Sequence, residues 1–214
     1  MSIALSLGNN LTTGGIFKPT AVNNTSVNNV TDFASVAGSS TLVLLSTQTA
    51  SASANISFTT GIDSTYDEYI FKFINMYPAS PGIFTFNMST DGGSTYAVTK
   101  TSTFFYSRQN ESGSPAEINY EAGYDLAQST SYQNLTDSLG TNSDDSCSGY
   151  LHLFAPSSNT YVKHFLATVN NTYSIESFIA GYGNTTSAIN AVDFKFSSGN
   201  TDDGIIKMYG VAKS

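Results

Sequence analysis

Apolar residues recur at every second position in several short segments of the chain after Thr41. In Asn55–Thr59 and Ile83–Met88 this alternation places the apolar side chains on one face of an extended segment, as a half-buried β-strand requires. Tyr69–Tyr77 is apolar at both parities, which predicts a central strand. Pro78 is expected to end that strand, because proline cannot donate a hydrogen bond to a ladder.

The same pattern predicts further strands, separated by clusters of Gly, Asn, Ser or Pro that favour turns. They are Leu42–Leu45, Tyr150–Phe154, Tyr161–Val169, Ser174–Tyr182, Ile189–Phe196 and Ile205–Val211. Tyr96–Tyr106 predicts a strand pair or one long bent strand, and Thr90–Ser94 before it contains the Asp-Gly and Gly-Gly steps of a hairpin turn. Ser107–Asp145 predicts long loops around one or two strands, such as Tyr132–Thr136.

Helical periodicity is interrupted by Gly or Asn in every window of helical length. Many short strands with almost no helix predict an all-β domain, and an antiparallel two-sheet sandwich of jelly-roll-like form is the architecture that fits best. One domain over residues 41–214 is expected, since β sandwiches commonly reach ~200–250 residues.

Residues 1–40 differ from the rest, with Asn pairs and isolated apolar residues at no steady period. This composition is common in frayed termini. However, apolar residues spaced along the segment favour an extended N-terminal arm that becomes ordered against a neighbouring subunit. We expect the docked arm, with its anchors at Ile16, Phe17, Val27, Val30 and Phe33.

Charged residues make up only 11% of the 214 residues, and the formal net charge is −8. This acidic balance argues against nucleic acid and against an anionic membrane as partners. The start of the chain lacks the basic region of a secretory signal, so a soluble chain made in the cytoplasm of a cell is expected. A single cysteine, Cys147, excludes an intrachain disulfide framework.

Two histidines, His152 and His164, are the first candidates for acid–base chemistry or metal binding. No third ligand stands at a zinc-site spacing, and the acidic neighbours of Cys147 disfavour a thiolate nucleophile. Carboxylates gather in loops, so a glycosidase pair stays open, although the absence of Trp weakens that alternative. We therefore expect no enzyme: no catalytic residue, no metal site and no cofactor.

Five segments of the chain have distinctive sequences: Gly61–Phe73, Ser89–Tyr96, Leu151–Phe154, Phe194–Asn200 and Gly204–Gly210. These segments resemble parts of virion proteins from tailed phages, mainly marine ones. The resemblance covers roughly residues 42–211 and leaves out the N-terminal arm. It implies a β-sandwich structural subunit of the particle, on either the head or the tail.

Three functions remain open at this point. The first is a capsid decoration or cement subunit, attached to major capsid or tail proteins through its arm and assembled as a homo-oligomer, for which we expect a trimer. The second is a tail-fibre or receptor-binding module that contacts host surface glycans through loop tyrosines Tyr120, Tyr124 and Tyr132. The third is a glycan hydrolase.

Overall fold

Strands account for nearly all regular structure in the part of the chain that the computed structural model describes, residues 42–142 and 144–213. These residues hold twelve strands, a single 3₁₀ turn at Thr172–Ser174 (η2) and no α-helix, as the interrupted helical periodicity predicted. The expected arm and its anchors Ile16, Phe17, Val27, Val30 and Phe33 lie outside the described residues.

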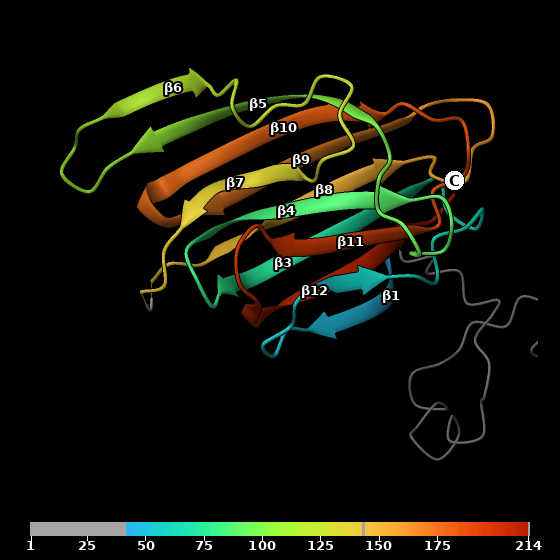
Figure 1. Cartoon of the computed structure of the whole chain (residues 1–214), viewed down its shortest axis with the longest axis horizontal. Helices are drawn as coiled ribbons and strands as arrows, with labels where there is room; N and C mark the ends of the chain where they lie inside the picture. Colours follow the sequence, from blue (N-terminus) through green and yellow to red (C-terminus); the bar gives the residue numbers. More distant parts are fainter. Residues whose placement is uncertain (1–41, 143, 214) are drawn as a thin grey trace, which may run out of the picture. The chain divides into compact units, whose positions relative to one another are not determined.

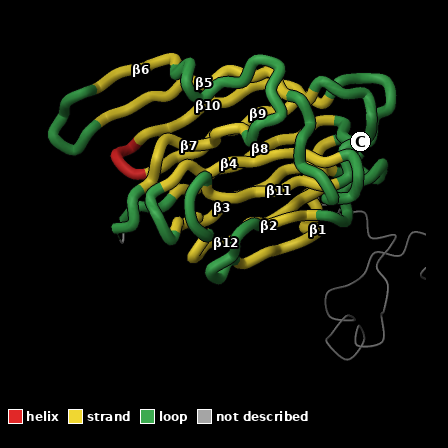
Figure 2. Tube along the Cα trace, viewed as in Figure 1, coloured by secondary structure: helices red, strands yellow, loops and turns green. Residues whose placement is uncertain are grey.

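Two antiparallel sheets pack face to face, with β2, β4, β7 and β11 forming the layer in front of the larger sheet in Figure 1. The larger sheet has the order β1-β12-β3-β8-β9-β10-β5-β6, and the smaller has the order β2-β11-β4-β7 (Figure 2). The predicted two-sheet antiparallel sandwich is therefore confirmed. The strands are β1 (Leu42–Thr49), β2 (Ile56–Phe58), β3 (Glu68–Pro78), β4 (Gly82–Ser89), β5 (Lys100–Gln109), β6 (Ala116–Tyr120), β7 (Gln133–Leu139), β8 (Cys147–Phe154), β9 (Lys163–Asn171), β10 (Ile175–Gly183), β11 (Ala191–Phe196) and β12 (Thr201–Val211).

The predicted hairpin around Thr90–Ser94 is wrong, although the turn itself is present. Gly92 and Gly93 adopt φ angles of 74° and 89°, as the Asp-Gly-Gly sequence allows. However, β4 before the turn belongs to the smaller sheet and β5 after it belongs to the larger sheet. The chain therefore crosses between the layers here, and residues 96–99, expected in a strand, form the crossing instead.

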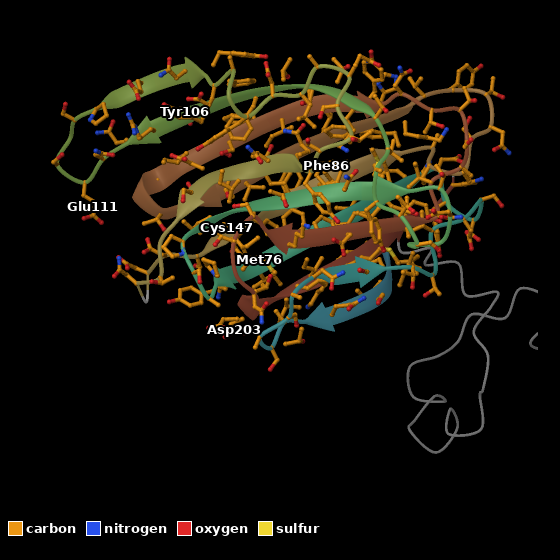
Figure 3. All side chains as sticks on the ribbon, viewed as in Figure 1. Met76, Phe86, Tyr106, Glu111, Cys147 and Asp203 are labelled. Carbon is orange, nitrogen blue, oxygen red and sulfur yellow. The ribbon has the colours of Figure 1, made fainter. Side chains whose placement is uncertain are left out.

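The core is a layer of aromatic rings between the two sheets. Phe194 on β11 is at its centre, with the ring centroids of Phe71 and Phe73 on β3 at 5.3 and 5.2 Å. The ring centroid of Phe86 on β4, which is labelled in Figure 3, lies 6.3 Å from that of Phe194 and 5.1 Å from that of Phe165 on β9. Each of these rings stands on the inward face of its strand. β4 and β11 are buried on the other face as well, so the half-buried strand expected for Ile83–Met88 is wrong in that respect.

Tyr69–Tyr77, apolar at both parities, lies within β3, an interior strand of the larger sheet that ends at Pro78 as predicted. Only one of its faces is buried, however. Tyr69, Phe71 and Phe73 point into the sandwich, whereas Ile70 is half-buried and Ile74 is exposed. In this strand, one set of apolar residues faces the core, and the set at the other parity lies on the outer face of the sheet.

Candidate functional site

The outer face of the eight-stranded sheet carries large apolar side chains that are exposed to solvent. Among the described residues, every exposed large apolar side chain except Tyr161 belongs to this sheet and stands at its outward parity. These residues are Leu44, Ile74, Phe105, Ile118, Tyr120, Tyr150 and Leu166. We call this set, together with its half-buried neighbours Ile70, Phe154, Phe178, Tyr182 and Tyr209, the aromatic face.

Strand register aligns these side chains in rows across the sheet. One row runs from Leu44 through Tyr209, Ile70 and His152 to Leu166. The next row runs through all the strands from β12 to β6, and its members are Lys207, Lys72, Tyr150, Thr168, Phe178, Phe105 and Tyr120. Because side chains two residues apart share a face, the aromatic face is continuous from one edge of the sheet to the other.

The rings of the aromatic face contact one another. Phe105 and Phe178 stack with centroids 5.0 Å apart and planes at 14°. His152 stands between Tyr150, at 5.2 Å, and Phe154, at 6.0 Å. Such ring contacts limit side-chain freedom before any partner arrives, which lowers the entropy that a partner must remove on binding.

Charges are sparse on this surface and unevenly placed. Lys72 on β3 and Lys207 on β12 are cross-strand neighbours on one half of the sheet, and Lys72 Nζ lies 5.4 Å from the ring centroid of Tyr209. Glu176 is on β10, in the other half, and Glu68 on β3 contacts His152 Nδ1. A surface rich in aromatic rings and poor in ions is typical of protein interfaces.

A shallow hollow of about 410 Å³ lies within the aromatic face, over β9, β10 and β5. Its walls include Phe154, His164, Leu166 and Tyr182, and Ala180 is at its base. The small residue at position 180 leaves this space between larger side chains.

A second hollow, of about 270 Å³, lies near the β5–β6 hairpin and is lined mostly by polar residues. Its charged groups are mostly engaged locally: Arg108 pairs with Glu117, and Asp145 accepts hydrogen bonds from the backbone and side-chain amides of Asn142 at 3.0 and 2.9 Å. Arg108 Nε is a buried donor without a partner in the structure. Glu111 marks the tip of this hairpin in Figure 3.

The three tyrosines expected to contact a glycan are in three separate places. Tyr120 belongs to the aromatic face and donates its hydroxyl to Asp125 at 2.5 Å. Tyr124 packs edge-on against Phe104, with centroids 5.2 Å apart, and donates to Asp137 at 2.7 Å. Burial, followed by that hydrogen bond, raises the pKa of Tyr124.

Tyr132 lies against the smaller sheet instead and joins a buried polar cluster around Asp193 on β11. The Asp193 carboxylate accepts hydrogen bonds from Tyr132 at 2.9 Å, from Ser57 Oγ at 2.5 Å and from Asn55 Nδ2 at 3.0 Å. Burial, then the bond to Asp193, raises the pKa of Tyr132, and Lys195 Nζ lies 4.1 Å from its ring centroid. The donors compensate the buried carboxylate, so this cluster stabilises the smaller sheet. The three rings do not form one platform, and glycan contact stays a prediction for them.

The structure also shows where the histidines and the cysteine considered for catalysis lie. β8 and β9 pair as neighbours, and His152 and His164 both stand at the outward parity of their strands. His152 pairs with Leu166 and His164 pairs with Tyr182 on β10, so the two histidines are not direct cross-strand partners. Cys147 is buried, and burial raises the pKa of its thiol. Over the described ranges, no group of three or more His, Cys, Asp or Glu side chains is arranged to hold a metal ion.

Two lysines are buried at one end of the sandwich, a feature that the sequence analysis missed. Lys100 on β5 and Lys163 on β9 both pair with Gly183 on β10. Lys100 Nζ donates to Asn87 Oδ1 at 2.6 Å and to the Val98 carbonyl at 2.8 Å, and burial lowers its pKa to about 7. Lys163 Nζ donates to carbonyl oxygens, including that of Tyr161 at 2.6 Å, and burial lowers its pKa as well. The sequence did contain a signal for the burial of both lysines, because each lysine alternates with the inward-facing residues of its strand.

The chain matches no protein-family model, no curated protein and no solved structure. Within residues 42–142 and 144–213, no helix is long and apolar enough to cross a membrane. The fold defines the class, an antiparallel β sandwich, and the surface that distinguishes this member is its aromatic face.

Proposed function

We propose that this chain is a structural subunit of a phage particle, a capsid decoration or cement protein that is made in the host cytoplasm and attaches to the virion through its N-terminal arm. The observation that carries the proposal is the aromatic face, whose exposed, ion-poor surface suits a protein that works by contact with other proteins. Contiguous apolar patches larger than a few hundred Å² on soluble proteins commonly mark interaction sites.

The strand order gives a second line of support. Leaving out β5, β6, β9 and β10, the sheets have the orders β1-β12-β3-β8 and β2-β11-β4-β7. We infer that these eight strands are a jelly roll, in which the chain passes from one four-stranded sheet to the other at every step except the step from β4 to β7. Jelly rolls form viral capsid domains and lectin domains, so this architecture supports both a particle subunit and a glycan-binding module.

The arm supplies the proposed attachment. Its anchors are apolar residues separated by polar ones, and each could contribute ~1.5–3 kcal/mol if fully buried on a partner. The intervening Asn, Ser and Thr residues cannot form a core of their own, so the arm gains order from the surface that it contacts. Its partners are other virion proteins, namely major capsid or tail proteins.

Deletion of residues 1–38 tests the attachment. We expect a folded domain that no longer remains on purified particles lacking the native protein, whereas the full-length chain remains on them. Imaging of labelled full-length protein on the particle then distinguishes the head from the tail. Equal retention of the truncated and full-length chains would contradict attachment through the arm, and absence from the particle would contradict the proposal as a whole.

A receptor-binding module that recognises host surface glycans is the second candidate. One observation favours it: the hollow in the aromatic face is bordered by the rings of Phe154, His164 and Tyr182, and aromatic rings stack on sugars. A glycan array separates the two candidates. Specific binding that is lost on Tyr182→Ala would favour the module over the decoration subunit.

A further inference from the structure

We infer that the aromatic face is covered by the same face of a second copy of this chain, related by a twofold axis that runs parallel to the strands between β8 and β9. The inference rests on the proposed function as an assembly subunit and names the partner of that surface. In this arrangement β3 of one copy faces β10 of the other, β12 faces β5, and β1 faces β6.

The size of the surface matches what a stable dimer needs. Eight strands at roughly 4.8 Å each occupy a width of about 38 Å, and three rows of outward side chains at about 6.8 Å each occupy about 20 Å along the strands. The product is roughly 780 Å² per copy, close to the ~800 Å² per partner of a standard specific interface. Half of this width comes from β9, β10, β5 and β6, the strands that extend the larger sheet beyond the four strands that it contributes to the inferred jelly roll.

The charges on the aromatic face are complementary to one another under this axis. Lys72 and Lys207 stand in the same row as Phe178 and Phe105, on the opposite half of the sheet. The twofold axis exchanges the halves, so the two lysines of each copy lie over the stacked phenylalanines of the other, next to Glu176. A lysine ammonium group over the ring of a phenylalanine and a lysine ammonium group near a carboxylate are both favourable contacts. Without a partner, the directly opposed lysines repel each other.

Sedimentation velocity of the full-length chain over a range of concentrations tests this pairing. We expect a dimer, in place of the trimer expected from the sequence. Leu166→Lys, at the middle of the face where this residue is 50% exposed, is expected to raise the dissociation constant about tenfold or more. The matched control is Tyr161→Lys, which changes an exposed ring off the face and is expected to leave the dimer intact. A monomer at all concentrations, a trimer, or equal effects of the two variants would overturn the inference.

Reversing the charges on the two halves of the aromatic face tests directly whether the two copies are complementary in charge. Lys72→Glu with Lys207→Glu is expected to weaken the dimer, because it places carboxylates beside Glu176 of the other copy. Adding Glu176→Lys to the same chain is expected to restore most of the lost affinity, with circular dichroism confirming the fold of each variant. No recovery would overturn the twofold arrangement. A chain that forms this dimer but is absent from the particle would contradict only the proposed function, whereas a particle-bound chain insensitive to these variants would contradict only the dimer.

Discussion

Lys100 is buried without a carboxylate partner, and its surroundings favour the neutral amine. Its pKa falls from an ordinary 10.5 to about 7 in the folded protein. Between these values the unfolded chain binds a proton that the folded chain has lost, so this group makes the free energy of unfolding rise with pH across that window. Below about pH 7 both states are protonated, and the stability that this group contributes at high pH is lost.

The first prediction follows from this rise of the free energy of unfolding with pH. Between pH 7.5 and 9, the free energy of unfolding of the wild type should rise relative to Lys100→Met by about 1 kcal/mol per pH unit, because one proton is linked to folding. Urea unfolding at several pH values measures this difference. Lys72→Met, at an exposed position, controls for the loss of one positive charge, with all samples at a concentration at which the chain is monomeric. Parallel pH profiles for the wild type and Lys100→Met would show that Lys100 does not titrate in this range.

A second residue-scale prediction concerns the centre of the core. Phe194→Ala should lower the free energy of unfolding by about 3–5 kcal/mol, because it removes a fully buried ring that contacts aromatic side chains of both sheets. Phe105→Ala, on the aromatic face, should cost about 1 kcal/mol or less in a monomeric sample, because that ring is already exposed. Equal losses for the two variants, measured by denaturant unfolding, would argue against the described core.

At the scale of elements, the strands differ in how firmly they are held. β6 is short, mostly exposed and paired only with β5 in the described sheet, whereas β3 pairs on both sides and buries Tyr69, Phe71 and Phe73. Local opening of a strand requires little free energy when few apolar contacts are lost. β6 is therefore the element that opens most easily.

Hydrogen exchange followed by mass spectrometry checks this ranking. In a monomeric sample, amides of β6 should exchange about a hundredfold or more faster than those of β3, and β1, the other edge strand, should be intermediate because it is partly buried. If the dimer inferred above forms, exchange in β6 should slow at high protein concentration. Protection of β6 equal to that of β3 at every concentration would contradict this view of the edge.

At the scale of the whole molecule, the described residues contain a complete core, and Ser40–Ser214 is one compact unit. Removal of residues 1–38 should therefore shift the thermal unfolding midpoint by no more than about 2–4 °C, equivalent to ~1 kcal/mol for a domain of this size. Differential scanning calorimetry of the full-length and truncated chains measures the shift. A drop larger than 10 °C would mean that the first 38 residues contribute to the core.

The sequence by itself determined most of the strands and which side chains of those strands point inward, although it did not predict β6 and placed residues 96–99 in a strand. That information is local, because side chains alternate with a period of two whatever the strand's neighbours are. Phe71, Phe86 and Phe194 are core residues for this reason. Turn chemistry at Asp91–Gly93 is local too, since positive φ angles depend on the residue that adopts them.

Tertiary structure alone decided which strands pair and what each outward face meets. The turn after β4 leads into the opposite sheet, because hydrogen bonds to β7 and β11 occupy the edges of β4 on which a hairpin partner would pair. The same long-range pairing separated Tyr120, Tyr124 and Tyr132, placed Lys100 and Lys163 beside Gly183, and aligned the outward residues of the larger sheet into one aromatic face. These features depend on contacts between residues far apart along the chain, and no local period encodes them.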